Sequence, residues 1–153
     1  MSHSPNTFTG EYSYTVDPKS RVNIPAKFRQ SLSPENDNSF AITKGMDQCI
    51  WVYPVVEWNK VLTKLRQQPS SQTNRAFTRD YSRFASTVSY DKQGRILLST
   101  ELMNYAEIDR QVTIIGMINK IEIWNPDLLK NFDKQVLSQN NEAFNELAEK
   151  IIL

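Results

Sequence analysis

Asp91-Lys92-Gln93-Gly94-Arg95 has a counterpart 74 residues earlier, Asp17-Pro18-Lys19-Ser20-Arg21, with the same Asp-x-x-x-Arg spacing. Each motif follows a run in which apolar residues alternate with polar ones, the period of a half-buried strand. Further along, Gly45-Met46 matches Gly116-Met117, and the run that begins at Ile50 matches the run that begins at Ile121, both 71 residues apart. Four matched segments in register indicate that the chain is an internal duplication.

Each copy is predicted to fold as strand, turn, strand, short helix, two strands and a second helix. We expect an α+β fold of two tandem units with flanking helices, and a core that the halves share because roughly 70 residues bury little apolar surface alone. A polar segment, Gln67 to Asn74, predicts a linker. The predicted divisions are a first unit at 8–66, a linker and basic helix at 67–83, a second unit at 84–137 and a C-terminal helix at 138–153.

The composition excludes several classes of protein. The formal net charge is +1, and ten Lys/Arg against seven Asp/Glu in residues 1–80 are offset by eight against ten in residues 81–153. No cationic tail is present. The first five residues carry no apolar segment typical of a signal peptide, and the longest apolar run, 50–56, is too short to cross a bilayer. We therefore expect a soluble cytoplasmic protein without a membrane partner.

The sequence offers few candidates for catalytic residues or metal ligands. Cys49 is the single cysteine and lies in an apolar run, which favours a buried thiol over a nucleophile. His3 is the single histidine and has no ligand-type neighbours. The sequence contains no Ser/His/Asp or Cys/His set and no glycine-rich phosphate loop. We expect no catalytic residues, metal, cofactor or small-molecule substrate.

The Asp-x-x-x-Arg motif has two interpretations. At a turn between two strands the carboxylate can accept hydrogen bonds from turn amides and from the guanidinium, which would be a small, local stabilisation. Spacing alone favours this simple interpretation. The second interpretation is that the Asp holds the Arg stiffly, so that its fork can bind guanine O6 and N7. Nearby cations would then contact phosphates: Lys19, Lys27, Arg29 and Lys92.

A family resemblance favours the second interpretation. The runs Asp17 to Arg29 and Asp91 to Leu98 resemble the MraZ family of bacterial transcription regulators, and each half resembles an AbrB-type swapped-hairpin DNA-binding unit. Further matches lie at 44–54, 75–79 and 121–124, so the resemblance covers roughly 8–130. It implies tandem AbrB-like units of a double-psi-like barrel type and a ring-shaped homo-oligomer, with an octamer expected. It also implies a nucleoid-associated regulator that binds double-stranded DNA at repeated promoter sites of cell-division and cell-wall genes.

The same resemblance implies a DNA-contacting set in the two motifs and beside them. Its members are Asp17, Lys19, Arg21, Lys27, Arg29, Asp91, Lys92 and Arg95. The units differ, because Ser20 stands in place of Gly94, and Met103 stands where the first unit has Arg29. We expect Ser20 to alter the first turn and the two units to contribute unequally to DNA binding.

Other features have plainer interpretations. Four aromatic residues are expected to pack inside the protein rather than stack on bases: Trp51, Tyr53, Trp58 and Trp124. Arg75, Arg79 and Arg83 form a stripe at helical spacing that is typical of a solvated face and that could contact phosphates in a ring. Apolar surface at 50–56 is expected to drive self-association. The alternative function is a protein-interaction module of the same fold that binds no DNA.

Overall fold

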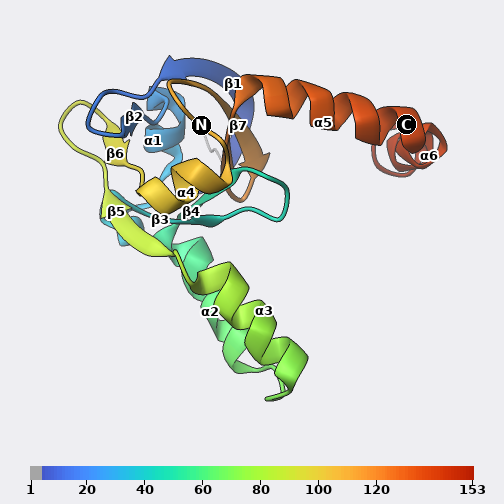
Figure 1. The fold of residues 1–153 in the computed structure, drawn as a ribbon, viewed down its shortest axis with the longest axis horizontal. Coiled ribbons are helices and arrows are strands. Elements are labelled where there is room, and N and C mark those ends of the chain that lie inside the picture. The colour runs from blue at the N-terminus through green and yellow to red at the C-terminus, as the bar shows by residue number, and fades with distance from the viewer. Residues whose placement is uncertain (1–4) are drawn as a thin grey trace.

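The computed structural model describes residues 5–153, so the predicted roles of His3 and of the start of the chain lie outside the described residues (Figure 1). The first half of the chain contributes β1 (Phe8–Thr15), β2 (Arg21–Asn23), α1 (Ala26–Ser31), the 3₁₀ turn η1 (Pro34–Asn36), β3 (Ser39–Lys44), β4 (Ile50–Pro54) and α2 (Val55–Arg66). After α3 (Gln72–Ser82), the second half contributes β5 (Ser86–Ser89), β6 (Arg95–Leu97), α4 (Thr100–Tyr105), β7 (Gln111–Ile118), β8 (Ile121–Trp124), α5 (Pro126–Gln139) and α6 (Asn141–Ile151).

The two halves exchange strands. One antiparallel sheet of six strands has the order β1-β7-β8-β4-β3-β5, and a two-stranded ribbon pairs β2 with β6. The first strand of each half therefore pairs with the third strand of the other half, β1 with β7 and β5 with β3. Strands β1, β3 and β4 of the first half correspond to β5, β7 and β8 of the second. Exchanging each strand for its counterpart gives the same order read from the opposite end of the sheet. This is the pseudo-twofold plan expected of an α+β protein built from tandem swapped-hairpin units.

Residues of both halves form one main core. Fully buried side chains from the first half meet those of the second: Phe8, Val22, Ile24, Phe28, Ile42, Ile96, Leu98, Leu102, Ile114 and Ile123. Tyr12 and Tyr14 pack against this cluster as partly buried residues, as the alternation in β1 predicted. Burial is the main favourable contribution to folding, and neither half could form this main core alone. The division at 8–66, 67–83, 84–137 and 138–153 into separate units therefore stays a prediction.

Helices α2 and α3 form a first arm that projects from the sheet (Figure 1). Its root is a second buried cluster that contains Tyr53, Trp58 and Tyr81. The predicted linker was too long, because α3 begins at Gln72. The side chain of Ser71 caps the helix by accepting a hydrogen bond from the backbone N–H of Asn74.

Helices α5 and α6 form a second arm that leaves the sheet in another direction (Figure 1). The side chain of Asn125 caps α5, and Pro126 occupies the first turn of the helix. The expectation of spare apolar surface at 50–56 was wrong, because Ile50, Val52 and Tyr53 are buried in β4 at the centre of the sheet. Several exposed apolar side chains lie on the second arm, where Phe144 is 53%, Leu147 56% and Ile151 73% exposed.

Candidate nucleic-acid interface

The two Asp-x-x-x-Arg motifs form loop one (Asp17–Arg21) and loop two (Asp91–Arg95), which have the same backbone. In loop one the N–H of Ser20 donates to the carbonyl of Asp17, and the N–H of Asp17 donates to that of Arg21, both at 2.9 Å. Loop two has the same two bonds at the same distance. The expectation that Ser20 alters the turn was wrong, because Ser20 takes the left-handed conformation (φ 63°) that Gly94 takes (φ 80°).

In each loop the aspartate organises the turn and the arginine, as predicted. One oxygen of Asp17 accepts the backbone N–H groups of Lys19 and Arg21 at 2.9 and 2.8 Å. The other oxygen accepts the Nε–H of Arg21 at 2.7 Å. Asp91 makes the equivalent three bonds at 2.9 Å. The pKa of each carboxyl lies below its usual value, chiefly because the N–H of the motif arginine donates to it.

The two loops lie side by side. Strand β2 pairs with β6 so that Val22 lies opposite Ile96. Ile24 N–H donates to the Gly94 carbonyl and Leu98 N–H to the Ser20 carbonyl, both at 2.8 Å. These bonds join the loops into one continuous edge, at the end of the molecule away from the second arm (Figure 1).

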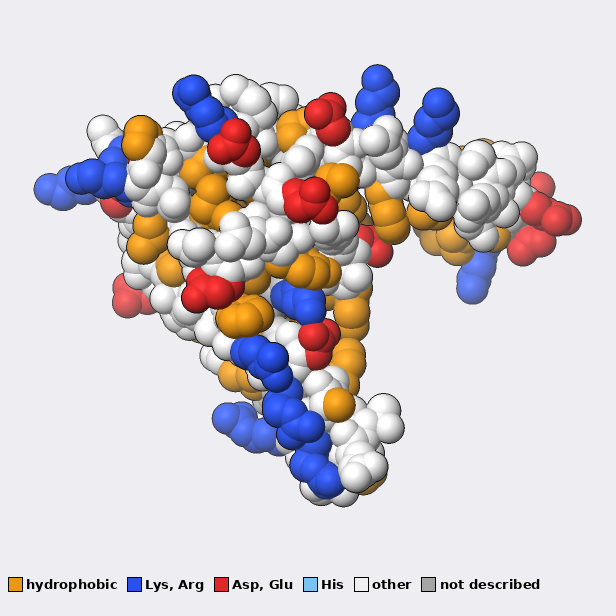
Figure 2. Space-filling model, in the orientation of Figure 1, with side chains coloured by type: hydrophobic (Ala, Val, Ile, Leu, Met, Phe, Trp, Pro, Cys, Tyr) orange, Lys and Arg blue, Asp and Glu red, His pale blue; other side chains and the backbone are white. Residues whose placement is uncertain are grey.

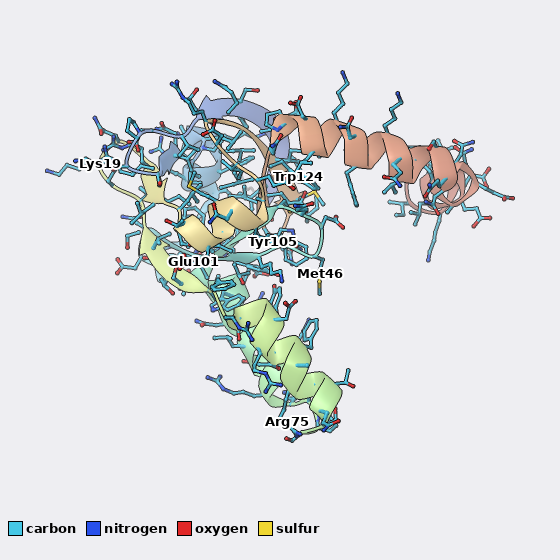
Figure 3. All side chains as sticks on the ribbon, viewed as in Figure 1. Lys19, Met46, Arg75, Glu101, Tyr105 and Trp124 are labelled. Atoms are coloured by element: carbon cyan, nitrogen blue, oxygen red, sulfur yellow. The ribbon has the colours of Figure 1, made fainter. Side chains whose placement is uncertain are left out.

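The edge has arginines at its base and lysines at its tips. The side chains of Arg21 and Arg95 are 33% and 24% exposed. Lys19 and Lys92 are exposed, and Lys19 projects outward at this end (Figure 3). Because each arginine is neutralised by its aspartate, the positive field of the edge comes mainly from the two lysines.

The remaining two predicted cations lie on α1. Lys27 is exposed, and its Nζ donates to the carbonyl of Thr9 at 3.3 Å. Arg29 is only partly exposed, its Nε–H donates to the carbonyl of Ile24 at 3.0 Å, and its guanidinium lies 5.6 Å from the ring centre of Tyr90. Arg29 therefore supports the edge from below. DNA contact by any of the eight predicted residues stays a prediction.

Sequence reasoning missed one residue of this site. Asn23 donates from its side chain to the carbonyl of Gln93 in loop two at 3.0 Å. The sequence does mark Asn23 as unusual, because this polar residue interrupts the apolar segment after loop one, whereas the second half has Leu97 at the same position.

The aromatic residues, the cysteine and the arginine stripe considered in the sequence lie outside the edge. Tyr53, Trp58 and Trp124 are buried and Trp51 is partly buried, so the prediction that they pack inside the protein is confirmed. The thiol of Cys49 is buried as predicted, and burial raises its pKa. Figure 2 shows Lys and Arg side chains down the first arm, where Arg75, Arg79 and Arg83 are exposed. Within residues 5–153 no cluster of three metal-ligating side chains occurs, and no helix is long and apolar enough to cross a membrane.

Comparison with known proteins gives a consistent set of relatives. The family model described as "MraZ protein, putative antitoxin-like" matches residues 7–80 and 83–152. A protein of Carboxydothermus hydrogenoformans and one of Natranaerobius thermophilus are each 40% identical over 146 residues, 95% of this chain and 96% of the relative. One of Pediococcus pentosaceus is 38% identical with the same coverage. All three carry the name "Transcriptional regulator MraZ".

Proposed function

This chain belongs to the MraZ family, and on that premise we propose that it regulates transcription by binding double-stranded DNA through the edge formed by loops one and two. The observation that carries the proposal is the joined pair of Asp–Arg loops with exposed lysines at their tips. Two copies of the same Asp–Arg loop at one edge suit a partner whose structure repeats along its length, as that of double-stranded DNA does. The protein acts as a binding module, without cofactor, small-molecule substrate or catalysis.

The aspartate prepares the arginine to read a base. Asp17 and Asp91 take the Nε–H of their arginines, which leaves the Nη groups as donors. A guanidinium held in one direction loses little freedom on binding, and its fork matches guanine O6 and N7. Arg21 and Arg95 therefore supply sequence preference, while the neutral Asp–Arg pairs add little non-specific attraction.

The lysines supply affinity that does not depend on sequence. Lys19, Lys92 and Lys27 are exposed on or beside the edge and can release counterions from phosphates. This division agrees with the general rule that phosphate contacts position a protein while base contacts specify the site.

Assembly explains how a chain of net charge +1 binds DNA. A ring of identical subunits, with an octamer as the proposed size, would place many copies of the edge on one side and concentrate their positive field. Such a ring suits repeated promoter sites, which we propose lie upstream of cell-division and cell-wall genes. The protein would then be cytoplasmic and associated with the nucleoid.

The proposal is tested by comparing arginine and lysine variants on DNA. The probe is a duplex selected by the wild-type protein from a randomised pool, with a scrambled duplex as reference. Replacing Arg21 or Arg95 with Ala should lower the preference for the selected duplex, by about 1–3 kcal/mol for a lost base contact. Lys19→Ala should weaken binding to both duplexes alike and reduce the salt slope. Arg66→Ala, at an exposed position of α2 outside the arginine stripe, is the matched control.

A contrary outcome has a definite meaning. If the wild-type protein shows no preference among duplexes, it does not read sequence. The alternative, a protein-interaction module of this fold, would then be favoured, and the exposed apolar side chains of the second arm are the feature that supports it.

A further inference from the structure

Loops one and two have the same backbone but different side-chain support. Two side chains of the first half hold loop two: Asn23 donates to the Gln93 carbonyl, and the guanidinium of Arg29 lies against Gly94. A carboxylate oxygen of Asp17 also lies 3.7 Å from Nη1 of Arg95, and this contact ties the two loops to each other. Loop two is therefore fixed from the opposite half of the chain as well as by its own aspartate.

The guanidinium of Arg29 lies close beside Gly94. A Cβ placed at Gly94 would lie 2.5 Å from Cζ, 2.6 Å from Nε and 2.9 Å from Nη2 of Arg29. The guanidinium thus occupies the space that a side chain at Gly94 would need. It is held in turn by its bond to Ile24 and by the ring of Tyr90. Arg29 fills the floor of loop two.

Among the residues that the structure describes, none forms an equivalent floor under loop one. The positions that correspond to Asn23 and Arg29 are Leu97, which is 55% exposed, and Met103. Neither side chain can donate a hydrogen bond to a carbonyl as Asn23 and Arg29 do. Beside loop one lies an open hollow of about 710 Å³, lined by residues that include Asp17, Ser20, Met103 and Arg110. Ser20 adds strain through its left-handed backbone.

We propose that Arg29 and Asn23 are positioning residues that hold loop two in its DNA-reading conformation, whereas loop one reaches its final conformation on the DNA. This inference rests on the proposed function. A loop ordered in advance keeps more of its contact energy as affinity than one that must order during binding. Both arginines read bases, and loop two contributes the larger share of the sequence preference.

The inference is tested first without DNA, by amide hydrogen exchange. In the wild-type protein Gln93 and Arg95 should exchange more slowly than their counterparts Lys19 and Arg21. In Arg29→Met, which installs the residue of the other half, the loop two amides should exchange about three- to tenfold faster. Equal rates for the two loops in the wild-type protein would overturn the inference, whether or not the protein binds DNA.

A charge-conserving variant separates positioning from phosphate contact. Arg29→Lys keeps the positive charge but loses the planar group that fills the floor of loop two. It should behave like Arg29→Met, with faster exchange in loop two and a preference for the selected duplex lowered about tenfold. The salt slope should not change. Normal exchange and preference in Arg29→Lys, with a smaller salt slope only in Arg29→Met, would make Arg29 a phosphate contact and contradict the inference.

The duplication also offers a gain-of-support test. The double variant Ser20→Gly/Met103→Arg places the floor residues of loop two beneath loop one. The amides of Lys19 and Arg21 should then exchange as slowly as those of loop two. Thermal unfolding checks that the variant folds, and Arg79→Met is a control that should leave both loops unchanged. Loop one amides that keep their wild-type rates in the folded variant would show that Arg29 and Gly94 are not the source of the difference.

Discussion

Ser20 holds a left-handed backbone conformation that only glycine adopts without strain, and it does so because the hydrogen bonds of loop one require it. The sequence predicted how each aspartate bonds its turn and its arginine, since both motifs contain every donor and acceptor involved. It did not predict that Ser20 would copy the turn of Gly94. Local propensity disfavours that backbone, and the bonds that impose it include one from Leu98, far along the chain. The place of Arg29 under loop two depends on packing between halves in the same way.

Replacing Ser20 with Gly should stabilise the protein. The left-handed conformation costs a residue with a side chain about 1–2 kcal/mol. Glycine also makes the unfolded chain more flexible, which offsets part of this stabilisation. The free energy of unfolding should therefore rise by about 0.5–1 kcal/mol. Denaturant unfolding measures this free energy. The reverse change, Gly94→Ser, is the control and should destabilise, because the left-handed backbone of Gly94 (φ 80°) strains a residue with a side chain and the added Cβ would displace the guanidinium of Arg29.

The loop aspartates should make stability depend on pH in the acid range. Hydrogen bonds from Arg21 N–H and Arg95 N–H lower the pKa of Asp17 and Asp91 in the folded state. A lowered folded pKa contributes stability that is fully present above the unfolded value, about 3.9, and is lost as pH falls through the folded value. The difference in unfolding free energy between wild type and Asp17→Asn/Asp91→Asn should be constant above about pH 5 and shrink below pH 4. A difference that grows on acidification would contradict this assignment.

At the scale of elements, some helix starts have local sequence signals. Asn125 caps α5 and is followed by Pro126, and Pro54 precedes α2. The contact between the central strands could not be predicted in detail, because it joins residues of both halves. In β8 the buried carboxylate of Glu122 accepts the indole N–H of Trp124 at 2.7 Å and that of Trp51, from β4, at 2.9 Å. Glu122 thereby links the roots of both arms.

Replacing Glu122 with Gln should destabilise the protein. The amide offers one oxygen to two indole donors, so one N–H in the buried site would face the amide nitrogen instead of an acceptor. Leaving a buried donor unsatisfied costs about 1–3 kcal/mol. Chemical denaturation followed by tryptophan fluorescence measures the loss. Glu101→Gln, at an exposed position of α4, is the matched control, and equal stability of the two variants would count against a structural role for Glu122.

At the scale of the whole molecule, the duplication and shared core could be predicted from the matched segments, whereas the surface available for assembly could not. The run at 50–56 looked available because its sequence is apolar, but strand exchange places it at the centre of the sheet. Helix α6 carries the exposed apolar stripe instead. Phe144, Leu147 and Ile151 on this helix are more than half exposed, so they pack little against the core or against α5.

Self-association should therefore depend on α6. Phe144→Asp/Leu147→Asp should reduce the assembly of the wild-type protein, because each substitution places a charge in an apolar contact between copies. The fold should survive, since both positions are exposed in the single chain. Light scattering at micromolar concentration measures the size, and Glu146→Gln on the same helix is the control. An unchanged assembly in the double variant would locate the contact elsewhere.

The central claim is that each aspartate orients an arginine that reads DNA, and Asp17→Ala tests it most directly. The measurement is titration of wild type, Asp17→Ala and Arg21→Ala against the selected and the scrambled duplex. If Asp17 orients Arg21, its loss should weaken binding to the selected duplex and leave binding to the scrambled duplex unchanged or stronger, because a negative charge has been removed. Unchanged preference in both Asp17→Ala and Arg21→Ala would mean that the motif only stabilises a turn, and would contradict the account.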